Sequence, residues 1–299
     1  MTKAEIQAKV QSYYDMAAAA GYNVFAVVLL GSQIYGLDEY SEEYTSDIDV
    51  FAIVFNSFED LIGNSTPIQR IGYTPELRLE RTQVHLCTFV EFMRGLMSQN
   101  MRYIDPLFSE YYAVNKKYKD VYEKLRSHRA AIATASQYAF AEASVRFIRA
   151  TYSALAPEDG SSEPSNDPKI QKFGYNPKRL HHLARCLLLM TRYYNGRPYE
   201  ECIKVTGEDR ERLMRLKKGL GYDEAKAAIA AGRGYMNSIE AVANLIKQKH
   251  PQDEVNQAVF EYLRSLMAIL QKQAIRAEVR AKTDYIADIV DNIGDDVAE

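Results

Sequence analysis

Two short apolar runs that flank a polar interval dominate the first third of the chain. The first run covers residues 25–30 and ends at the dipeptide 31–32, and the second run covers residues 46–54 and begins with polar residues. Apolar runs of this length, bounded by glycine and polar residues, predict two β-strands joined by a loop. Successive strand side chains point to opposite faces, so Asp47 and Asp49 are expected on one face of the second strand.

The hydrophobic pattern then changes from strand spacing to helix spacing. A third strand is expected at residues 81–89, where Gln83, His85 and Cys87 alternate with apolar residues. After residue 116 apolar residues recur mainly every three or four positions, which predicts helices. The expected helices cover 116–127, 130–154, 176–196, 208–218, 222–247, which is broken or bent around Gly232 and Gly234, and 253–290. The pattern therefore predicts an α+β protein, with a small mixed sheet and helices followed by a mainly helical part.

The length of 299 residues allows two domains, each with its own core. We expect one domain over residues 1–113 and a helical domain over residues 114–299. A segment near 156–168 is rich in acidic, Pro, Ser and Gly residues and is expected to be a mobile surface loop, and the end of the chain an acidic, solvated tail.

The composition is that of an ordinary globular protein, with 26% charged and 47% hydrophobic residues. No apolar run is long enough to span a membrane, and residues 1–20 lack the apolar core of a signal peptide, so a cytoplasmic protein without membrane contacts is expected. The three cysteines, Cys87, Cys186 and Cys202, show no ligand spacing and are expected to be buried free thiols.

Asp47 and Asp49 are the first candidates for chemistry. Two carboxylates this close repel each other unless a cation lies between them, and oxygen-only ligands suit Mg²⁺. The preceding Gly31 allows a phosphate to approach the backbone, and Ser32 adds a hydroxyl donor. The alternative is that the two acids only form part of a solvated surface.

A basic segment is the second candidate. Residues 169–218 contain 13 lysines and arginines against 5 acids, although the whole chain has a net charge of −3. On the helix expected at 176–196, Lys178, His182, Arg185 and Arg192 share one face and could bind a polyanion. The alternative is a solvated helical face.

The order of these motifs resembles polymerase-β-type nucleotidyltransferases. The string Gly31-Ser32-x-x-Tyr35-Gly36, followed by Ser46-Asp47-Ile48-Asp49, resembles the branch associated with RNA repair and RNA ligases in bacteria and phages. The segments 173–178 and 182–185 resemble a helix of that branch, and Leu216-Lys217-Lys218-Gly219 is similar to a later element. Together these elements cover roughly residues 27–224.

The resemblance implies a polymerase-β-like palm before the helical domain and a metal-dependent transfer of a nucleoside monophosphate. Asp47 and Asp49 would be catalytic and would hold Mg²⁺ or Mn²⁺. The donor would be a nucleoside triphosphate, ATP or CTP, and the acceptor a hydroxyl of an RNA, tRNA-like end. The residues implied to bind the nucleotide are Gly31, Ser32, Tyr35, Ser46, Lys178, His182, Arg185 and Lys217.

The chain also departs from the pattern of this branch. The position of the third carboxylate falls at or near Gln83, and the nearest acid is Glu80. Sixteen positions separate Gly31 from Asp47, about four more than the branch has, and Phe51 stands where the branch has a basic residue. Two alternatives therefore stay open, a transferase that modifies a protein hydroxyl and a non-catalytic sensor of nucleotide or RNA.

Overall fold

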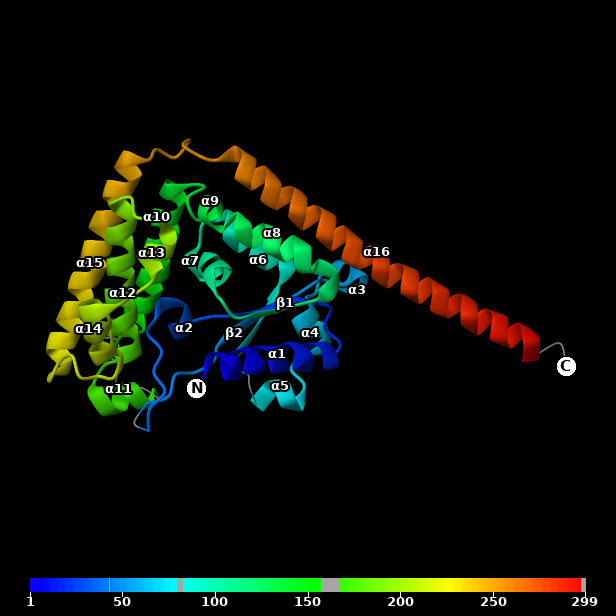
Figure 1. Cartoon of the computed structure of the whole chain (residues 1–299), viewed down its shortest axis with the longest axis horizontal. Coiled ribbons are helices and arrows are strands. Elements are labelled where there is room, and N and C mark those ends of the chain that lie inside the picture. Colours follow the sequence, from blue (N-terminus) through cyan, green and yellow to red (C-terminus); the bar gives the residue numbers. More distant parts are fainter. Residues whose placement is uncertain (43, 80–82, 157–166, 297–299) are drawn as a thin grey trace.

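A mixed β-sheet with helices on both faces forms one half of the protein, and a bundle of helices forms the other (Figure 1). The computed structural model describes residues 1–42, 44–79, 83–156 and 167–296. In this part of the chain the sheet has four strands in the order β3-β2-β1-β4, with β1 antiparallel to β2 and β4 and β2 parallel to β3. The strands are β1 (Val24–Leu29), β2 (Val50–Val54), β3 (Val84–Thr88) and β4 (Tyr112–Val114). The predicted α+β class with a mixed sheet is confirmed.

The helices of the first half surround the sheet, and the chain then continues into the helices of the bundle. Those of the first half are α1 (Lys3–Ala19), α2 (Ser32–Tyr35), α3 (Phe58–Ile62), α4 (Pro67–Ile71), α5 (Pro75–Leu79), α6 (Phe89–Met97), α7 (Met101–Ile104) and the 3₁₀ turn η1 (Asp105–Phe108). Those that follow are η2 (Lys116–Tyr118), α8 (Lys119–Ser127), α9 (Arg129–Ala133), α10 (Gln137–Ser153), α11 (Pro168–Phe173), α12 (Pro177–Tyr194), α13 (Tyr199–Ile203), α14 (Gly207–Lys217), α15 (Ala225–Lys249) and α16 (Gln257–Asp296).

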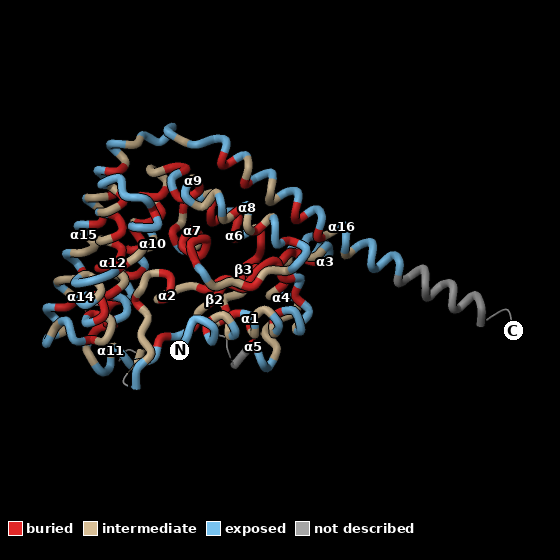
Figure 2. Tube along the Cα trace, viewed as in Figure 1, coloured by how far each residue is buried: buried red, intermediate tan, exposed pale blue. Residues whose placement is uncertain are grey.

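The two faces of the sheet bury different side chains because β2 alternates between them. Val50 and Ala52 point toward α1 and pack with Val10 of that helix. Phe51 and Ile53 point to the opposite face and belong to the large core shared with α6, α8 and the bundle. Figure 2 shows the buried residues concentrated in the strands and around α7. Asp49 lies on the Phe51 side, so it faces the bundle.

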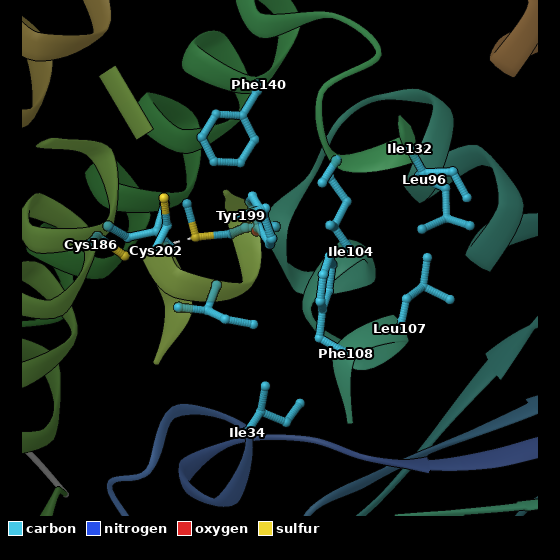
Figure 3. Close-up of a cluster of buried hydrophobic side chains, with 14 of the residues drawn as sticks. Ile34, Leu96, Ile104, Leu107, Phe108, Ile132, Phe140, Cys186, Tyr199 and Cys202 are labelled. Carbon is cyan, nitrogen blue, oxygen red and sulfur yellow. Dashed lines mark hydrogen bonds between the residues drawn. The ribbon is translucent and has the colours of Figure 1, made fainter. Parts of the chain in front are cut away.

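The sheet half and the bundle share one hydrophobic core. Figure 3 shows Ile34 of α2 and Ile104 of α7 in the same cluster of buried side chains as Phe140 and Tyr199 of the helical half. The last helix, α16, returns to the sheet half, where the Gln271 side chain donates to the Asn56 carbonyl at 2.7 Å. The domain boundary at residues 113/114 stays a prediction, because buried residues from both sides of it belong to the same cluster.

Several predicted elements differ from the structure in extent. Asp47 and Asp49 lie just before β2 rather than inside a strand, and β3 begins only at Val84. The helix predicted over 130–154 is two helices, because Ser136 adopts an extended conformation and caps α10 by accepting the Ala139 N–H. Helices α4, α11 and α13 and strand β4 were not predicted.

Other predictions fall wholly or partly outside the described residues. Most of the segment near 156–168 that was predicted to be a mobile loop, residues 157–166, lies outside the described residues. Glu80 and the last residues of the acidic tail also lie outside them. The three cysteines are buried free thiols, as predicted. Among the described residues no helix combines the length and the apolar character needed to cross a membrane.

Helix α15 runs without interruption from Ala225 to Lys249, so the helix is not broken at its glycines. Gly232 faces α10 and α12, and a Cβ atom there would lie 2.4 Å from Leu155 Cδ2. Gly234, one half-turn on, has no atom within 4 Å of its Cβ position. Gly232 is therefore needed for close helix packing, whereas Gly234 is not.

We predict that Gly232→Ala and Gly234→Ala have different effects on stability. Alanine in a helix interior gains about 0.5–1 kcal/mol over glycine, so Gly234→Ala should raise the free energy of unfolding by about that amount. The free energy of unfolding of Gly232→Ala should be about 1–3 kcal/mol lower than that of Gly234→Ala, because overpacking against the buried Leu155 opposes the gain. Urea unfolding of both variants measures the difference, and equal effects would contradict the packing role of Gly232.

Candidate functional site

A cavity of about 440 Å³ lies between the ends of β1 and β2 and the helices α12 and α14. Nine of the ten predicted site residues line it, although they are spread over more than half of the chain. They are Gly31, Ser32, Tyr35, Asp47, Asp49, Lys178, His182, Arg185 and Lys217. Ser46 is the exception, because it is buried outside the lining and its hydroxyl accepts the Glu39 N–H at 3.1 Å. The structure therefore gives Ser46 a role in shaping the loop.

Strand pairing brings the Gly-Ser and the Asp-x-Asp motifs together. Leu30, just past the end of β1, donates its N–H to the Asp49 carbonyl at 2.7 Å. This bond places Gly31 beside Asp49, and a Cβ at Gly31 would lie 3.6 Å from Asp49 Oδ2. Gly31 has a φ of +81°, which favours glycine over residues with a side chain. The Gln33 side chain donates to the Asp47 carbonyl at 2.9 Å, and this bond holds the Asp47 backbone in place.

The two carboxylates lie at the mouth and on the wall of the cavity. Asp47 is exposed and Asp49 is half-buried. Burial raises the pKa of Asp49, and the negative charge of Asp47 raises it further, while Lys178 and Lys217 act in the opposite direction. Neither carboxylate forms a hydrogen bond or an ion pair with a described residue, so both keep their oxygens for a ligand.

These carboxylates fit a hard divalent cation, although they do not complete its coordination. No group of three or more His, Cys, Asp or Glu residues converges in the part of the chain that the structure describes. Mg²⁺ commonly uses only one or two protein carboxylates and takes its other oxygens from water and phosphate groups. The donor set of Asp47 and Asp49 therefore suits a metal that arrives with a phosphate ligand.

Lys217 joins the cavity wall of α14 to the loop after β1. Its Nζ donates to Ser32 Oγ at 2.9 Å and to the Leu37 carbonyl at 3.0 Å. Burial lowers the pKa of Lys217 to about 8, and the charge of Lys178 acts in the same direction. An anion bound beside these lysines would favour their charged forms, because opposite charges stabilise each other.

Helix α12 carries further cations of the cavity, and Arg102 of α7 is another. The helix begins as predicted, with the Asn176 side chain accepting the Arg179 N–H and Pro177 in the first turn. The predicted Lys178, His182 and Arg185 line the cavity, and so does Arg179, which was not predicted. Burial lowers the pKa of His182 well below its ordinary value, so this imidazole is neutral at neutral pH and the cations of α12 in the cavity are Lys178, Arg179 and Arg185. Arg192 does not extend this stripe, because its guanidinium donates to the Lys204 carbonyl at 2.6 Å and pairs with Asp209 at 2.9 Å.

Arg185 is buried at the floor of the cavity with part of its guanidinium unpaired. Only 4% of the residue is exposed, and its Cζ lies 3.8 Å from the centroid of the Tyr35 ring. Its Nε and Nη1 have no hydrogen-bond partner, and neither does His182 Nδ1. Buried donors without partners cost about 1–3 kcal/mol each, more when they are charged. A ligand with several oxygens would satisfy the guanidinium and offset this cost.

Asp105 lies beneath Arg185 and was not predicted as part of the site. The Tyr35 hydroxyl donates to one oxygen of Asp105 at 2.6 Å, and the Tyr199 hydroxyl donates to the other at 2.7 Å. Burial raises the pKa of Asp105, while Arg185 and the two hydroxyls oppose this shift. Asp105 is therefore the nearby acid that balances the charge of Arg185, and its oxygens are already occupied.

His85 takes the cavity-facing position on β3 that the sequence assigned to Gln83. The parallel pairing sets His85 opposite Phe51, and alternation along the strands puts both on the Asp49 side of the sheet. Burial lowers the pKa of His85, and Arg102 and Lys178 lower it further, so the imidazole is neutral at neutral pH. The alternation of residues 83–87 was visible in the sequence, but the register that selects His85 was not.

Comparisons with known proteins leave the family open. No family model matches the chain, and searches of curated proteins and of solved structures return no match. The geometry of the cavity therefore carries the functional argument.

We predict that anion binding in the cavity weakens as Lys217 loses its proton. ATP without metal is a suitable probe, because its phosphates keep a constant charge above neutral pH. Since the pKa of Lys217 is about 8, ATP affinity should fall about fivefold between about pH 7.5 and about pH 9.5. Arginine stays charged over this range, so Lys217→Arg should flatten the decrease. Calorimetric titration at both pH values checks this, and an equal decrease in the variant would contradict it.

Proposed function

We propose that the protein is a metal-dependent nucleotidyltransferase that moves a nucleoside monophosphate from ATP or CTP to a hydroxyl of an RNA, tRNA-like end. The proposal includes a polymerase-β-like palm for the sheet half. One observation carries it: two carboxylates with free oxygens, the Ser32–Lys217 pair and the cations of α12 line the same cavity. This combination of acids and cations is what a metal–triphosphate complex requires.

The residues divide between the metal and the phosphates. Asp47 and Asp49 would hold Mg²⁺ or Mn²⁺, which when bound offsets negative charge on the triphosphate and on the leaving pyrophosphate. Ser32 and Lys217 lie together and are placed to contact phosphate oxygens. Arg185 offers two buried, unpaired nitrogens of a planar guanidinium, which suits a phosphate group.

His85 is the group that this chain offers in place of a third acid. The acceptor hydroxyl attacks the α-phosphorus, the bond from that phosphorus to the bridging oxygen breaks, and pyrophosphate leaves. The hydroxyl proton must move to a base near the carboxylates. His85 lines the same cavity and is neutral, so one of its ring nitrogens can accept this proton.

The second candidate function is a nucleotide sensor that binds the triphosphate without transferring it. The observation that favours it is the absence of a third carboxylate at Gln83, where the resemblance expects one. A sensor and an enzyme would both bind nucleotide in the cavity, so only turnover distinguishes them.

We predict that the protein transfers label from an α-labelled nucleoside triphosphate to RNA in the presence of Mg²⁺ or Mn²⁺. Asp47→Asn and Asp49→Asn should each lower the rate at least about a hundredfold, because the lost charge stabilisation is worth several kcal/mol. Asp15→Asn is the control, since Asp15 lies on α1 at the opposite face of the sheet.

The result depends on which macromolecule becomes labelled. Label in bulk tRNA that is lost in the Asp variants supports the proposal. Label in protein instead would replace the RNA acceptor by a protein hydroxyl. Nucleotide binding without any transfer would leave the sensor.

We predict that His85→Gln lowers kcat by about a hundredfold or more with little change in KM for the nucleotide, because removal of a general base affects the chemical step. The decline of kcat on the acidic side of the pH profile, which reports protonation of His85, should also disappear in the variant. His250→Gln, at the far end of α15, is the control. An unchanged pH profile would show that His85 has no role in proton transfer.

A further inference from the structure

A second hollow opens beside the cavity and continues it along the surface. This lysine groove has a volume of about 290 Å³ and is bounded by α11, the start of α12 and the end of α14. Tyr44, Lys178 and Lys217 line both hollows, so the groove and the cavity meet. The residues that line the groove are Tyr44, Lys169, Lys172, Phe173, Pro177, Lys178, Lys217 and Lys218.

The described residues balance the charge of the lysine groove only in part. Its lining contains five lysines and no acidic residue. Lys218 pairs with Glu39 at 2.7 Å, but Lys169, Lys172 and Lys178 form no ion pair with a described residue. Burial lowers the pKa of Lys169, and the charge of Lys178 lowers it further. The groove therefore favours a ligand that brings several negative charges.

Two aromatic rings alternate with these lysines. The Tyr44 ring lies 5.1 Å from Lys217 Nζ and 5.8 Å from Lys218 Nζ, measured to the ring centroid. The Phe173 ring lies against Gly219, where a Cβ atom would be 2.6 Å from the ring, and Lys172 Nζ lies 5.0 Å from the ring centroid. Gly219 also has a φ of +78°, so both the conformation and the close contact require glycine there. Both rings are half-buried and held in place.

We infer that the lysine groove binds a single-stranded stretch of the RNA acceptor next to its reacting end; this rests on the proposed function. Lysines bind phosphates as point charges, and aromatic rings stack on unpaired bases. Single-stranded nucleic acid supplies both groups in alternation, whereas an acidic peptide supplies only the charges. The shared residues at the junction lead this strand from the groove to Asp47 and Asp49.

The contacts also indicate how the RNA is recognised. The groove lining has no arginine, asparagine or glutamine side chain that could form paired hydrogen bonds with a base edge. Recognition should therefore depend on backbone charge and stacking, with little preference for sequence.

The test uses the full-length protein and fluorescein-labelled single-stranded RNA oligonucleotides, with binding measured by fluorescence anisotropy at several salt concentrations. Lys169→Glu/Lys172→Glu should weaken RNA binding at least tenfold. The decrease of log affinity with log salt should also become less steep, by about 1.4 in slope, because two phosphate contacts are lost. Lys119→Glu/Lys124→Glu on α8 makes the same charge change in the sheet half and should have a small effect.

A second variant separates stacking from charge. Phe173→Leu should weaken RNA binding about tenfold without changing the salt slope. Phe173→Tyr should bind RNA about as tightly as the wild type, because tyrosine keeps the aromatic ring. Unfolding midpoints near that of the wild type confirm that the variants fold.

ATP affinity, measured on the same proteins, distinguishes this inference from the proposed function. Loss of RNA binding with unchanged ATP binding supports the inference. Equal loss of both would assign the groove to the triphosphate and overturn it. Unchanged RNA binding, or binding of polyglutamate in place of RNA, would also overturn it. Wild-type protein that binds RNA through the groove but transfers no nucleotide would refute the transferase alone.

Discussion

The pairing of the end of β1 with the residues before β2 is the constraint on which the site depends. A single backbone hydrogen bond, from Leu30 to the Asp49 carbonyl, sets Gly31 and Ser32 beside the carboxylates. The fifteen residues between Gly31 and Asp47, which include the short helix α2, form a connection whose ends this pairing joins. Because the two strands are antiparallel, the chain can leave β1, pass through this loop and return at the same end of the sheet.

The loop between β1 and β2 is also the surface on which the helical half is fixed. Arg210 of α14 donates to the Gly36 and Asp38 carbonyls at 2.9 and 2.8 Å, and Lys217 and Lys218 follow on the same side. Several cations of the basic segment therefore attach α14 to the sheet half. This attachment positions the other cations of the segment at the cavity. His181 supports the arrangement from α12, where its Nδ1 contacts the Leu213 carbonyl at 2.9 Å.

The floor of the cavity combines satisfied and unsatisfied polar groups. Asp105 has both oxygens occupied by tyrosine hydroxyls, and this network fixes Tyr35 beneath the guanidinium of Arg185. Arg185 itself keeps two buried nitrogens without partners. Buried polar groups without hydrogen-bond partners cost folding free energy, and a bound ligand that supplies the missing partners removes this cost. Such unpaired groups are therefore a reason to look for a ligand at this position. The proposals for the cavity and for the lysine groove both use cations, such as Arg185 and Lys178, that form no ion pair with a described residue.

The sequence by itself determined the elements whose signals are local. Alternation and helical spacing identified three strands and α12 with its Asn176–Pro177 start, and residue chemistry identified the acids and cations that line the cavity. The tertiary structure alone decided which of these groups meet. Strand register selected His85 over Gln83, and long-range contacts withdrew Arg192 from the cavity and placed Asp105 between two distant tyrosines. Local patterns depend on the few neighbouring residues that set backbone geometry, whereas these choices depend on pairing and packing between segments far apart in the chain.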